Sequence, residues 1–273
     1  MDDLAAKIIA DIDTGYLREP KDTARDYIGA SMAGTDCIAE LQLSLRGFPS
    51  VTPDPRLKRI FFAGHRIEDW VVYDLKKRAD LRVWEKDDTT GRQHRREWLG
   101  GHIVCHADGL VNFEDGSDDL AILEIKSMND ARFKQFEKHG IKSANRKYYR
   151  QATMMMAMFA ISRTLFVAYN KNDSQLHAEI IPFDEEEWGE MFIKIQSAID
   201  GHSERVASTP NDWRCKSCFK REACWQPPVL PPECRFCIHS KPSEDGTWLC
   251  SKGKDASEVC NEYTQFQVSP KGG

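Results

Sequence analysis

The sequence contains no hydrophobic run long enough to span a membrane. Its richest apolar stretch, residues 154–161, is far shorter than the roughly 20 residues that a transmembrane helix needs. The chain starts with an acidic segment and lacks the apolar core that is typical of a secretory signal. These absences argue against a membrane partner, and we expect a cytoplasmic protein, from a bacterium or a phage-infected host cell.

The sequence also lacks an excess of positive charge. Its 38 lysines and arginines are outnumbered by 43 aspartates and glutamates, which gives a formal net charge of −5. A passive nucleic-acid coat protein is basic throughout, so this balance argues against that class. An enzyme that acts on DNA stays compatible, because it needs only a local basic surface. Residues 92–96 and 132–150 are basic enough to contact phosphates, although either stretch alone is typical of a solvated surface.

The hydrophobic periodicity predicts an α/β fold in which helices flank a mixed sheet. The predicted helices cover residues 2–12, 37–46 (starting near Thr35 or Asp36), 56–77, 144–161 and 184–200. The predicted strands cover residues 81–84, 97–99, 102–111, 120–127, 164–169 and 176–181, with a polar turn at 114–119.

Two carboxylates and a lysine fall on the predicted strands. Asp108 and Glu124 lie on the two arms of a hairpin, and Glu124 and Lys126 project from the same face of one strand. Charges in so apolar a strand are costly unless they are paired or metal-bound. The carboxylates suit Mg²⁺ or Mn²⁺, which would lower the pKa of a bound water. We expect such a metal to lower the pKa of Lys126 as well, so that it positions or deprotonates the water or holds the phosphate. His65 is a further potential ligand.

Nine cysteines are many for a protein of this size in a reducing compartment, where close pairs are more typical of metal ligands than of disulfides. Cys105 stands alone in an apolar strand and is predicted to be core. The first set, Cys37, Cys215, Cys218 and Cys224, suits either a [4Fe–4S] cluster or Zn²⁺. The second set follows a proline-rich linker and predicts a zinc-ribbon-like site, with His239 as an alternative ligand: Cys234, Cys237, Cys250 and Cys260.

Residues 25–225 resemble the PD-(D/E)xK nucleases, specifically the RecB-like branch that includes the CRISPR-adaptation nuclease and the AddB nuclease domain. The motifs that carry the resemblance are Gly64-His65-x-x-Glu68, Ala107-Asp108-Gly109, Glu124-Ile125-Lys126, Tyr148-Tyr149-Arg150-Gln151 and the first cysteine set. Ala107 replaces the family's proline. Met155 occupies the place of the tyrosine that usually follows the glutamine by four residues, and Tyr148 is an alternative on the same helix face.

The resemblance implies a restriction-endonuclease-like fold and metal-dependent hydrolysis of DNA. His65, Asp108, Glu124 and the Ile125 carbonyl would surround the metal, Lys126 would act at the water, and Gln151 would orient Lys126 or the DNA. The resemblance also favours the [4Fe–4S] cluster, as a passive clasp, over zinc in the first cysteine set. The residues predicted to contact DNA are Lys142, Arg146, Lys147, Tyr148 and Arg150.

These features predict a nuclease domain closed by an iron–sulfur clasp (1–228), a zinc-ribbon-like module (229–265) and a disordered tail (266–273). The leading hypothesis is an exonuclease that acts on DNA ends or single strands in recombination or repair. Its C-terminal module would contact DNA or a recombination protein. A non-catalytic DNA-binding recombination accessory protein and a structure-specific endonuclease are the alternatives.

Overall fold

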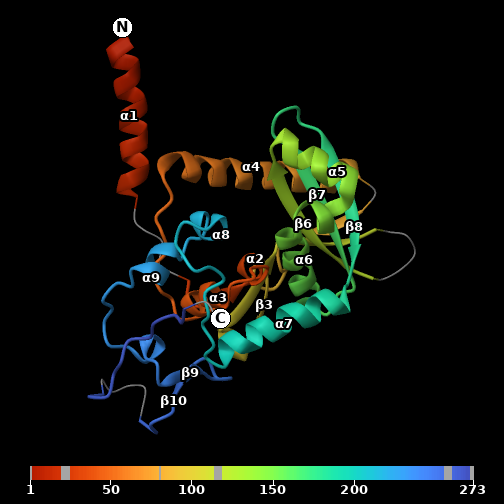
Figure 1. The fold of residues 1–273 in the computed structure, drawn as a ribbon. Helices are drawn as coiled ribbons and strands as arrows, with labels where there is room; N and C mark the ends of the chain where they lie inside the picture. Colours follow the sequence, from red (N-terminus) through yellow and green to blue (C-terminus); the bar gives the residue numbers. More distant parts are fainter. Residues whose placement is uncertain (1, 20–24, 80, 114–118, 255–259, 271–273) are drawn as a thin grey trace.

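A five-stranded mixed sheet lies on the right-hand side of the molecule in Figure 1. The computed structural model describes residues 2–19, 25–79, 81–113, 119–254 and 260–270, so most of the predicted turn at 114–119 lies outside the described residues. The strand order is β2-β5-β6-β7-β8, and β6 and β7 are parallel while the other neighbours are antiparallel. The strands are β2 (Arg82–Trp84), β5 (Gly109–Asn112), β6 (Ala121–Met128), β7 (Arg163–Asn170) and β8 (Leu176–Pro182).

A second, smaller sheet is joined to the first by a stretch of chain that is only one residue long. It has the order β1-β4-β3, with β1 (Ile28–Gly29), β4 (Ile103–Ala107) and β3 (His94–Trp98), and a 3₁₀ turn, η1 (Leu99–Gly101), joins β3 to β4. Asp108 stands between β4 and β5, where the chain passes from one sheet to the other. The predicted strand 102–111 is therefore two strands, and the break between them holds a predicted site residue.

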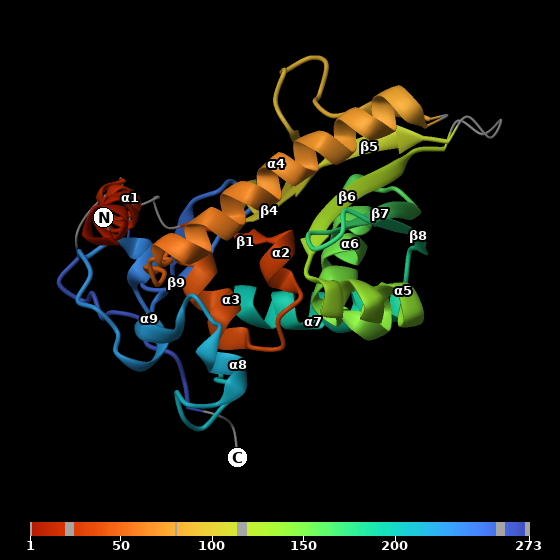
Figure 2. The same cartoon turned by 90° about the horizontal axis from the view of Figure 1, so that it is seen from above.

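Helices cover both faces of the large sheet (Figure 2). The helix α4 (Pro55–Arg78) starts at Asp54, whose carboxylate accepts a hydrogen bond from the Leu57 amide at 2.7 Å. It packs Ile67 and Val71 against the odd-numbered side chains of β6. The opposite face is covered by α6 (Arg146–Phe159), whose apolar residues join the main core together with Ile122. Side chains that alternate along β6 are thus buried on opposite faces of the sheet.

The helix α5 (Asp130–Ala144), which connects β6 to α6, was not predicted. Asn129 caps it by accepting a hydrogen bond from the Arg132 amide at 3.0 Å, and Phe133 and Phe136 are fully buried. Its many charged residues conceal this narrow apolar stripe in the sequence. Gly140, at φ 72°, breaks the helical geometry close to the end. After β8 comes α7 (Glu185–Ile199), which Asp184 caps through the Glu187 amide at 3.0 Å.

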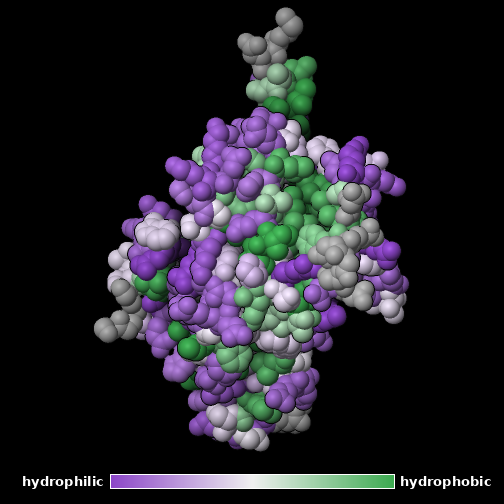
Figure 3. Space-filling view, turned by 90° about the vertical axis from the view of Figure 1, so that its right-hand side faces the viewer, coloured by the Kyte–Doolittle hydropathy of each residue, from purple (hydrophilic) through white to green (hydrophobic). Residues whose placement is uncertain are grey.

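The N-terminal helix α1 (Asp2–Arg18) extends from the body and meets α4 at its base (Figure 1). The expected amphipathic helix is present and longer than predicted. Leu4, Ile8, Ile9 and Leu17 are more than half exposed, and green side chains are visible on the helix at the top of Figure 3. No helix among the described residues is both long and apolar enough to cross a membrane.

The C-terminal region packs tightly against the rest of the molecule. Short elements α2 (Ala30–Ala33) and α3 (Ile38–Leu45) precede α4, and the C-terminal elements are α8 (Trp213–Lys216), α9 (Arg221–Trp225), η2 (Cys234–Phe236), β9 (Ser240–Pro242) and β10 (Trp248–Cys250). Leu43 and Phe48, at α3, share a core with Phe236, Phe266 and Val268. The predicted tail (266–273) therefore starts with buried residues rather than disorder. Two of its first three side chains, Phe266 and Val268, are apolar and pack in this core.

Arg46 joins α3 to the C-terminal module. Its side chain is 2% exposed, and its guanidinium donates to the backbone carbonyls of Arg235, Cys237 and Ser240 at 2.8–2.9 Å. The same group lies 5.0 Å from the centre of the Trp248 ring. The predicted boundary at residue 229 thus does not separate two independent structural units.

Candidate active site

Three side chains from neighbouring strands meet where β4 passes into β5. Asp108 accepts a hydrogen bond through Oδ2 from the Ile125 amide at 2.8 Å, which places it beside the middle of β6. Glu124 is 1% exposed, and its Oε1 contacts Lys126 Nζ, so the predicted shared face of this pair is confirmed. Gln151 on α6 donates to the same Oε1 at 2.7 Å. The hairpin thus brings both predicted carboxylates and the lysine together.

The second oxygen of Glu124 is the unusual feature of this cluster. Oε2 is buried and has no hydrogen-bond partner among the residues that the structure describes. A buried carboxylate oxygen without a donor costs free energy, and native proteins satisfy the great majority of such atoms. An oxygen of this kind is a fitting ligand for a hard divalent cation.

Glu68, on α4, belongs to the sequence motif around His65 but was not predicted to be a ligand. Its side chain is 30% exposed and lies close enough to Asp108 for the two carboxyl groups to influence each other's protonation. His65, the residue that we predicted as a ligand, is 79% exposed and lies 3.8 Å from Glu68, between Nδ1 and Oε2. The spacing of three residues places both on one helix face, but Glu68 is the one whose side chain extends to the cluster. The structure therefore favours Glu68 over His65 as the contribution of α4.

Burial and mutual repulsion shift the protonation of these carboxylates. Burial, reinforced by the negative charge of Asp108, raises the pKa of Glu68 to about 7. The pKa of Glu124 rises to about 8, chiefly through burial and against the influence of Lys126. Burial alone would lower the pKa of Lys126, but Glu124 and Asp108 outweigh it and raise this pKa. Without a bound metal, Lys126 is therefore a charged ammonium, and the lowered pKa that we predict belongs to the metal-bound site.

The start of α6 completes the surroundings of Lys126. Its Nζ lies 5.7 Å from the centre of the Tyr148 ring, so Tyr148 contacts the lysine from the same helix as Gln151. Met155, in the place of the family's tyrosine, is fully buried in the core. Of the two positions, only Tyr148 lies beside the cluster.

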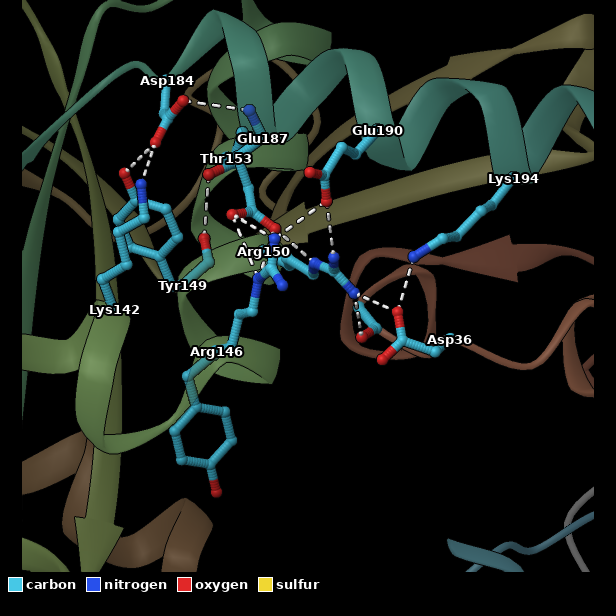
Figure 4. Close-up of polar contacts among 12 residues, drawn as sticks. Asp36, Lys142, Arg146, Tyr149, Arg150, Thr153, Asp184, Glu187, Glu190 and Lys194 are labelled. Atoms are coloured by element: carbon cyan, nitrogen blue, oxygen red, sulfur yellow. Dashed lines mark hydrogen bonds and ion pairs between the residues drawn. The ribbon is translucent and has the colours of Figure 1, made fainter. Parts of the chain in front are cut away.

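Most of the basic residues predicted to contact DNA are already paired with α7 (Figure 4). Lys142 contacts Asp184 at 2.7 Å, and Arg146 contacts Glu190 at 2.8 Å. Arg150 is buried among carboxylates, so the structure contradicts its predicted contact with DNA. Lys147 is exposed and has no carboxylate partner among the described residues. The partners on α7 are its N-cap Asp184 together with Glu187 and Glu190, and only tertiary packing brings them to α6.

The first cysteine set surrounds one cavity of about 120 Å³. Cys37 stands at the start of α3, while the three others lie in and beside α8 and α9: Cys215, Cys218 and Cys224. Arg205, Arg214, Lys220 and Arg221 line the same cavity. Burial raises the pKa of the Cys37 and Cys224 thiols and lowers that of Lys220 to about 8. The cationic lining suits thiolate ligands, because nearby positive charge favours their ionised form.

The second cysteine set lines a separate and smaller cavity, of about 20 Å³. Its walls include all four predicted cysteines together with His239: Cys234, Cys237, Cys250 and Cys260. Cys105, by contrast, is fully buried in the core against Met158, as expected for a lone cysteine in an apolar strand. As the side chains stand, no group of three or more His, Cys, Asp or Glu residues in the described chain is arranged to hold a metal ion.

No protein-family model and no curated protein matches the chain. Among solved structures, the alkaline exonuclease LHK-Exo from Laribacter hongkongensis is 19% identical over 65% of this chain and 88% of its own, with a TM-score of 0.41. A phage-related exonuclease from Haemophilus somnus 129PT is 14% identical over 63% of this chain and 91% of its own, with a TM-score of 0.45. At this level of similarity, function has to be inferred from the chain's own site.

Proposed function

We propose that the protein is a metal-dependent deoxyribonuclease that hydrolyses phosphodiester bonds, acting as an exonuclease on DNA ends or single strands. The observation that carries the proposal is the buried, unpaired Oε2 of Glu124, in a carboxylate that interacts with Lys126 through Oε1 and with the charges of Asp108 and Glu68. Three carboxylates and one lysine at the junction of two sheets are more than a surface ion pair requires. The end-directed mode comes from the family resemblance of the motifs.

The chemistry of the donors, rather than their present arrangement, fits Mg²⁺ or Mn²⁺, since carboxylate and carbonyl oxygens are the ligands that these ions prefer. Glu68, Asp108, Glu124 and the Ile125 carbonyl would hold the ion. When bound, it would lower the pKa of a water molecule and neutralise charge on the phosphate. The raised pKa values of Glu68 and Glu124 fit this role, because a cation would favour their ionised form.

The protein's own residues would arrange the reaction around that position. Lys126, 22% exposed and charged, would hold a phosphate oxygen or orient the attacking water. Water attacks phosphorus, the bond to the leaving oxygen breaks, and that oxygen takes up a proton. Gln151 would keep Oε1 of Glu124 engaged through its hydrogen bond, so that Oε2 stays directed to the metal.

Linear DNA and covalently closed circular DNA, each incubated with Mn²⁺ or Mg²⁺, test the proposal. We expect digestion of the linear substrate only, and its loss in Lys126→Ala. Lys134→Ala is the matched control, because Lys134 is an exposed lysine whose partner, Asp130, lies on its own helix. Equal digestion by Lys126→Ala would sink the assignment. Cleavage of the circle would indicate an endonuclease, and DNA binding without cleavage in either metal would indicate an accessory protein.

The two cysteine-lined cavities are the proposed cofactor sites, a [4Fe–4S] cluster in the first and Zn²⁺ in the second. Their sizes support this order, because the first cavity is about 120 Å³ and the second about 20 Å³, close to the ~10–15 Å³ that a single water needs. Cys215→Ser should remove iron and spare zinc, while Cys250→Ser should do the opposite. Metal analysis of anaerobically purified protein measures both. Two zinc ions and no iron would contradict the cluster without touching the nuclease proposal.

A further inference from the structure

Arg150 is a buried charge that the predicted chemistry does not use. It lies on α6, directly before Gln151, and its side chain is 2% exposed. A guanidinium has no neutral form near physiological pH, so it is buried only where partners compensate the loss of water. The identity of those partners shows what the residue holds in place.

Arg150 connects α6 to two other segments (Figure 4). Its Nη1 donates to Asp36 Oδ1 at 2.7 Å, in the segment between α2 and α3. Its Nη2 donates to Glu190 at 3.2 Å, and its Nε donates to Glu187, both on α7. Since the five donors of a guanidinium are rigidly oriented, these contacts fix the rotation of α6 about its own axis as well as its distance from α7.

The rotation of α6 determines where Gln151 points. Gln151 Nε2 reaches Glu124 Oε1 at 2.7 Å, and this hydrogen bond leaves Oε2 as the unpaired oxygen of the site. Small displacements matter at such a position, because a 1 Å error in placement can cost about a hundredfold in rate. The side chain that holds α6 in this rotation therefore acts on the carboxylate through Gln151.

Asp36, which accepts a hydrogen bond from Arg150, lies at the larger of the two cysteine-lined cavities. Asp36 directly precedes Cys37, and both residues line the larger cavity. Lys194 of α7 binds the same Asp36 oxygen at 2.5 Å, so the segment is held from two sides. The contact between Arg150 and Asp36 thus joins the wall of that cavity to the helix that carries Gln151.

We propose that Arg150 is a positioning residue, which binds Asp36 beside the four-cysteine cavity and α7 on its other side and so fixes Gln151 against Glu124. The proposal rests on the proposed metal site and adds the residue that sets its geometry. It also assigns Asp36 a role as the anchor of α6.

Binding of Mn²⁺, measured by the electron paramagnetic resonance of the free ion, tests this role without relying on catalysis. The variants are Arg150→Met, Gln151→Ala and their double substitution. Second-sphere substitutions cost about 10–100-fold in metal affinity, and we expect roughly tenfold weaker binding for each single variant. Because Arg150 acts through Gln151, the double variant should bind no more weakly than Gln151→Ala. Arg150→Lys should restore part of the affinity.

Arg146→Met is the matched control. Arg146 lies one turn earlier on α6 and contacts Glu187 and Glu190, but no contact joins it to Asp36. We expect its Mn²⁺ affinity to stay within about twofold of wild type, since Arg146 is half exposed and the buried Glu187 keeps its contact with Arg150. Equal losses in both arginine variants would overturn the proposal, since any weakening of the α7 contacts would then suffice.

Asp36→Ala keeps the proposal falsifiable if Arg150→Met does not fold, because Asp36 is 63% exposed and its loss leaves α7 paired with Arg150. It should weaken Mn²⁺ binding in the wild-type background and not in Gln151→Ala. Multiplying losses, or unchanged binding by folded variants, would overturn the proposal. No Mn²⁺ binding by wild type would overturn both proposals. Coupled Mn²⁺ binding without DNA digestion would overturn the nuclease alone.

Discussion

Replacement of Arg46 tests whether the C-terminal module is an integral part of the fold. Arg46→Met removes three hydrogen bonds from a charged donor to the carbonyls of Arg235, Cys237 and Ser240. Each such bond contributes about 1.5–3 kcal/mol. Burial of the guanidinium, which lowers its pKa to about 10, offsets part of that sum. We expect a net loss of about 3 kcal/mol, similar to the ~3–5 kcal/mol seen when a buried ionic contact is broken.

Urea denaturation measures this loss, and limited proteolysis with mass mapping locates it. The variant should expose cleavage sites in residues 229–254 before the rest of the chain unfolds, because the shared core of Phe48, Phe236 and Phe266 loses its polar anchor. Arg78→Met is the control, since Arg78 pairs with Asp74 at the surface of α4. A loss below about 1 kcal/mol with unchanged proteolysis would refute the view that Arg46 secures the module.

Three further predictions concern the metal site and the module. Glu68→Ala should weaken Mn²⁺ binding by about 10–100-fold and His65→Ala by less than about threefold in the same titration, and the reverse order would restore His65 as the ligand. In metal-free protein, the raised folded-state pKa values of Glu68 and Glu124 mean that stability is fully present below their ordinary value of 4.5 and falls as the pH rises through about 7–8. Denaturation at several pH values in a chelator should show this fall, and a flat profile would contradict it. Gly246→Ala should destabilise more than Gly253→Ala in thermal melts, since both have positive φ but only a Cβ at residue 246 would meet backbone, at 2.5 Å from the Gly100 carbonyl.

The strand that carries Glu124 and Lys126 could be predicted because its pattern is local. Two charges spaced by two residues in an apolar strand have to share a face, and the structure brings them into contact. The position of Asp108 could be predicted as well, because it lies on the neighbouring arm of the same predicted hairpin. The break in the chain at Asp108, which forms two sheets out of one predicted strand, depends on how the strands pair and leaves no local signal.

The partners of charged side chains were the harder part to predict. The basic start of α6 looked available for DNA because the acidic start of α7 is some forty residues away in sequence, at Asp184 and Glu187. His65 and Glu68 share a helix face, and only the packing of α4 on the sheet decides which one reaches the cluster. The narrow apolar stripe of the charged helix α5 could not be recognised for the same reason. Its packing against β7 and β8 decides which of its residues are buried.

The central claim is that the buried carboxylate of Glu124 serves chemistry rather than the fold. Glu124→Gln keeps the size of the side chain and the hydrogen bond from Gln151. It removes the ionisable carboxyl group, whose pKa is raised to about 8 by burial. The most direct measurement is the single-turnover rate of digestion of linear DNA in saturating Mn²⁺, paired with the melting temperature of the metal-free protein. We predict a rate at least about a hundredfold lower in a variant that melts no earlier than wild type. An unchanged rate in the folded variant would contradict the account.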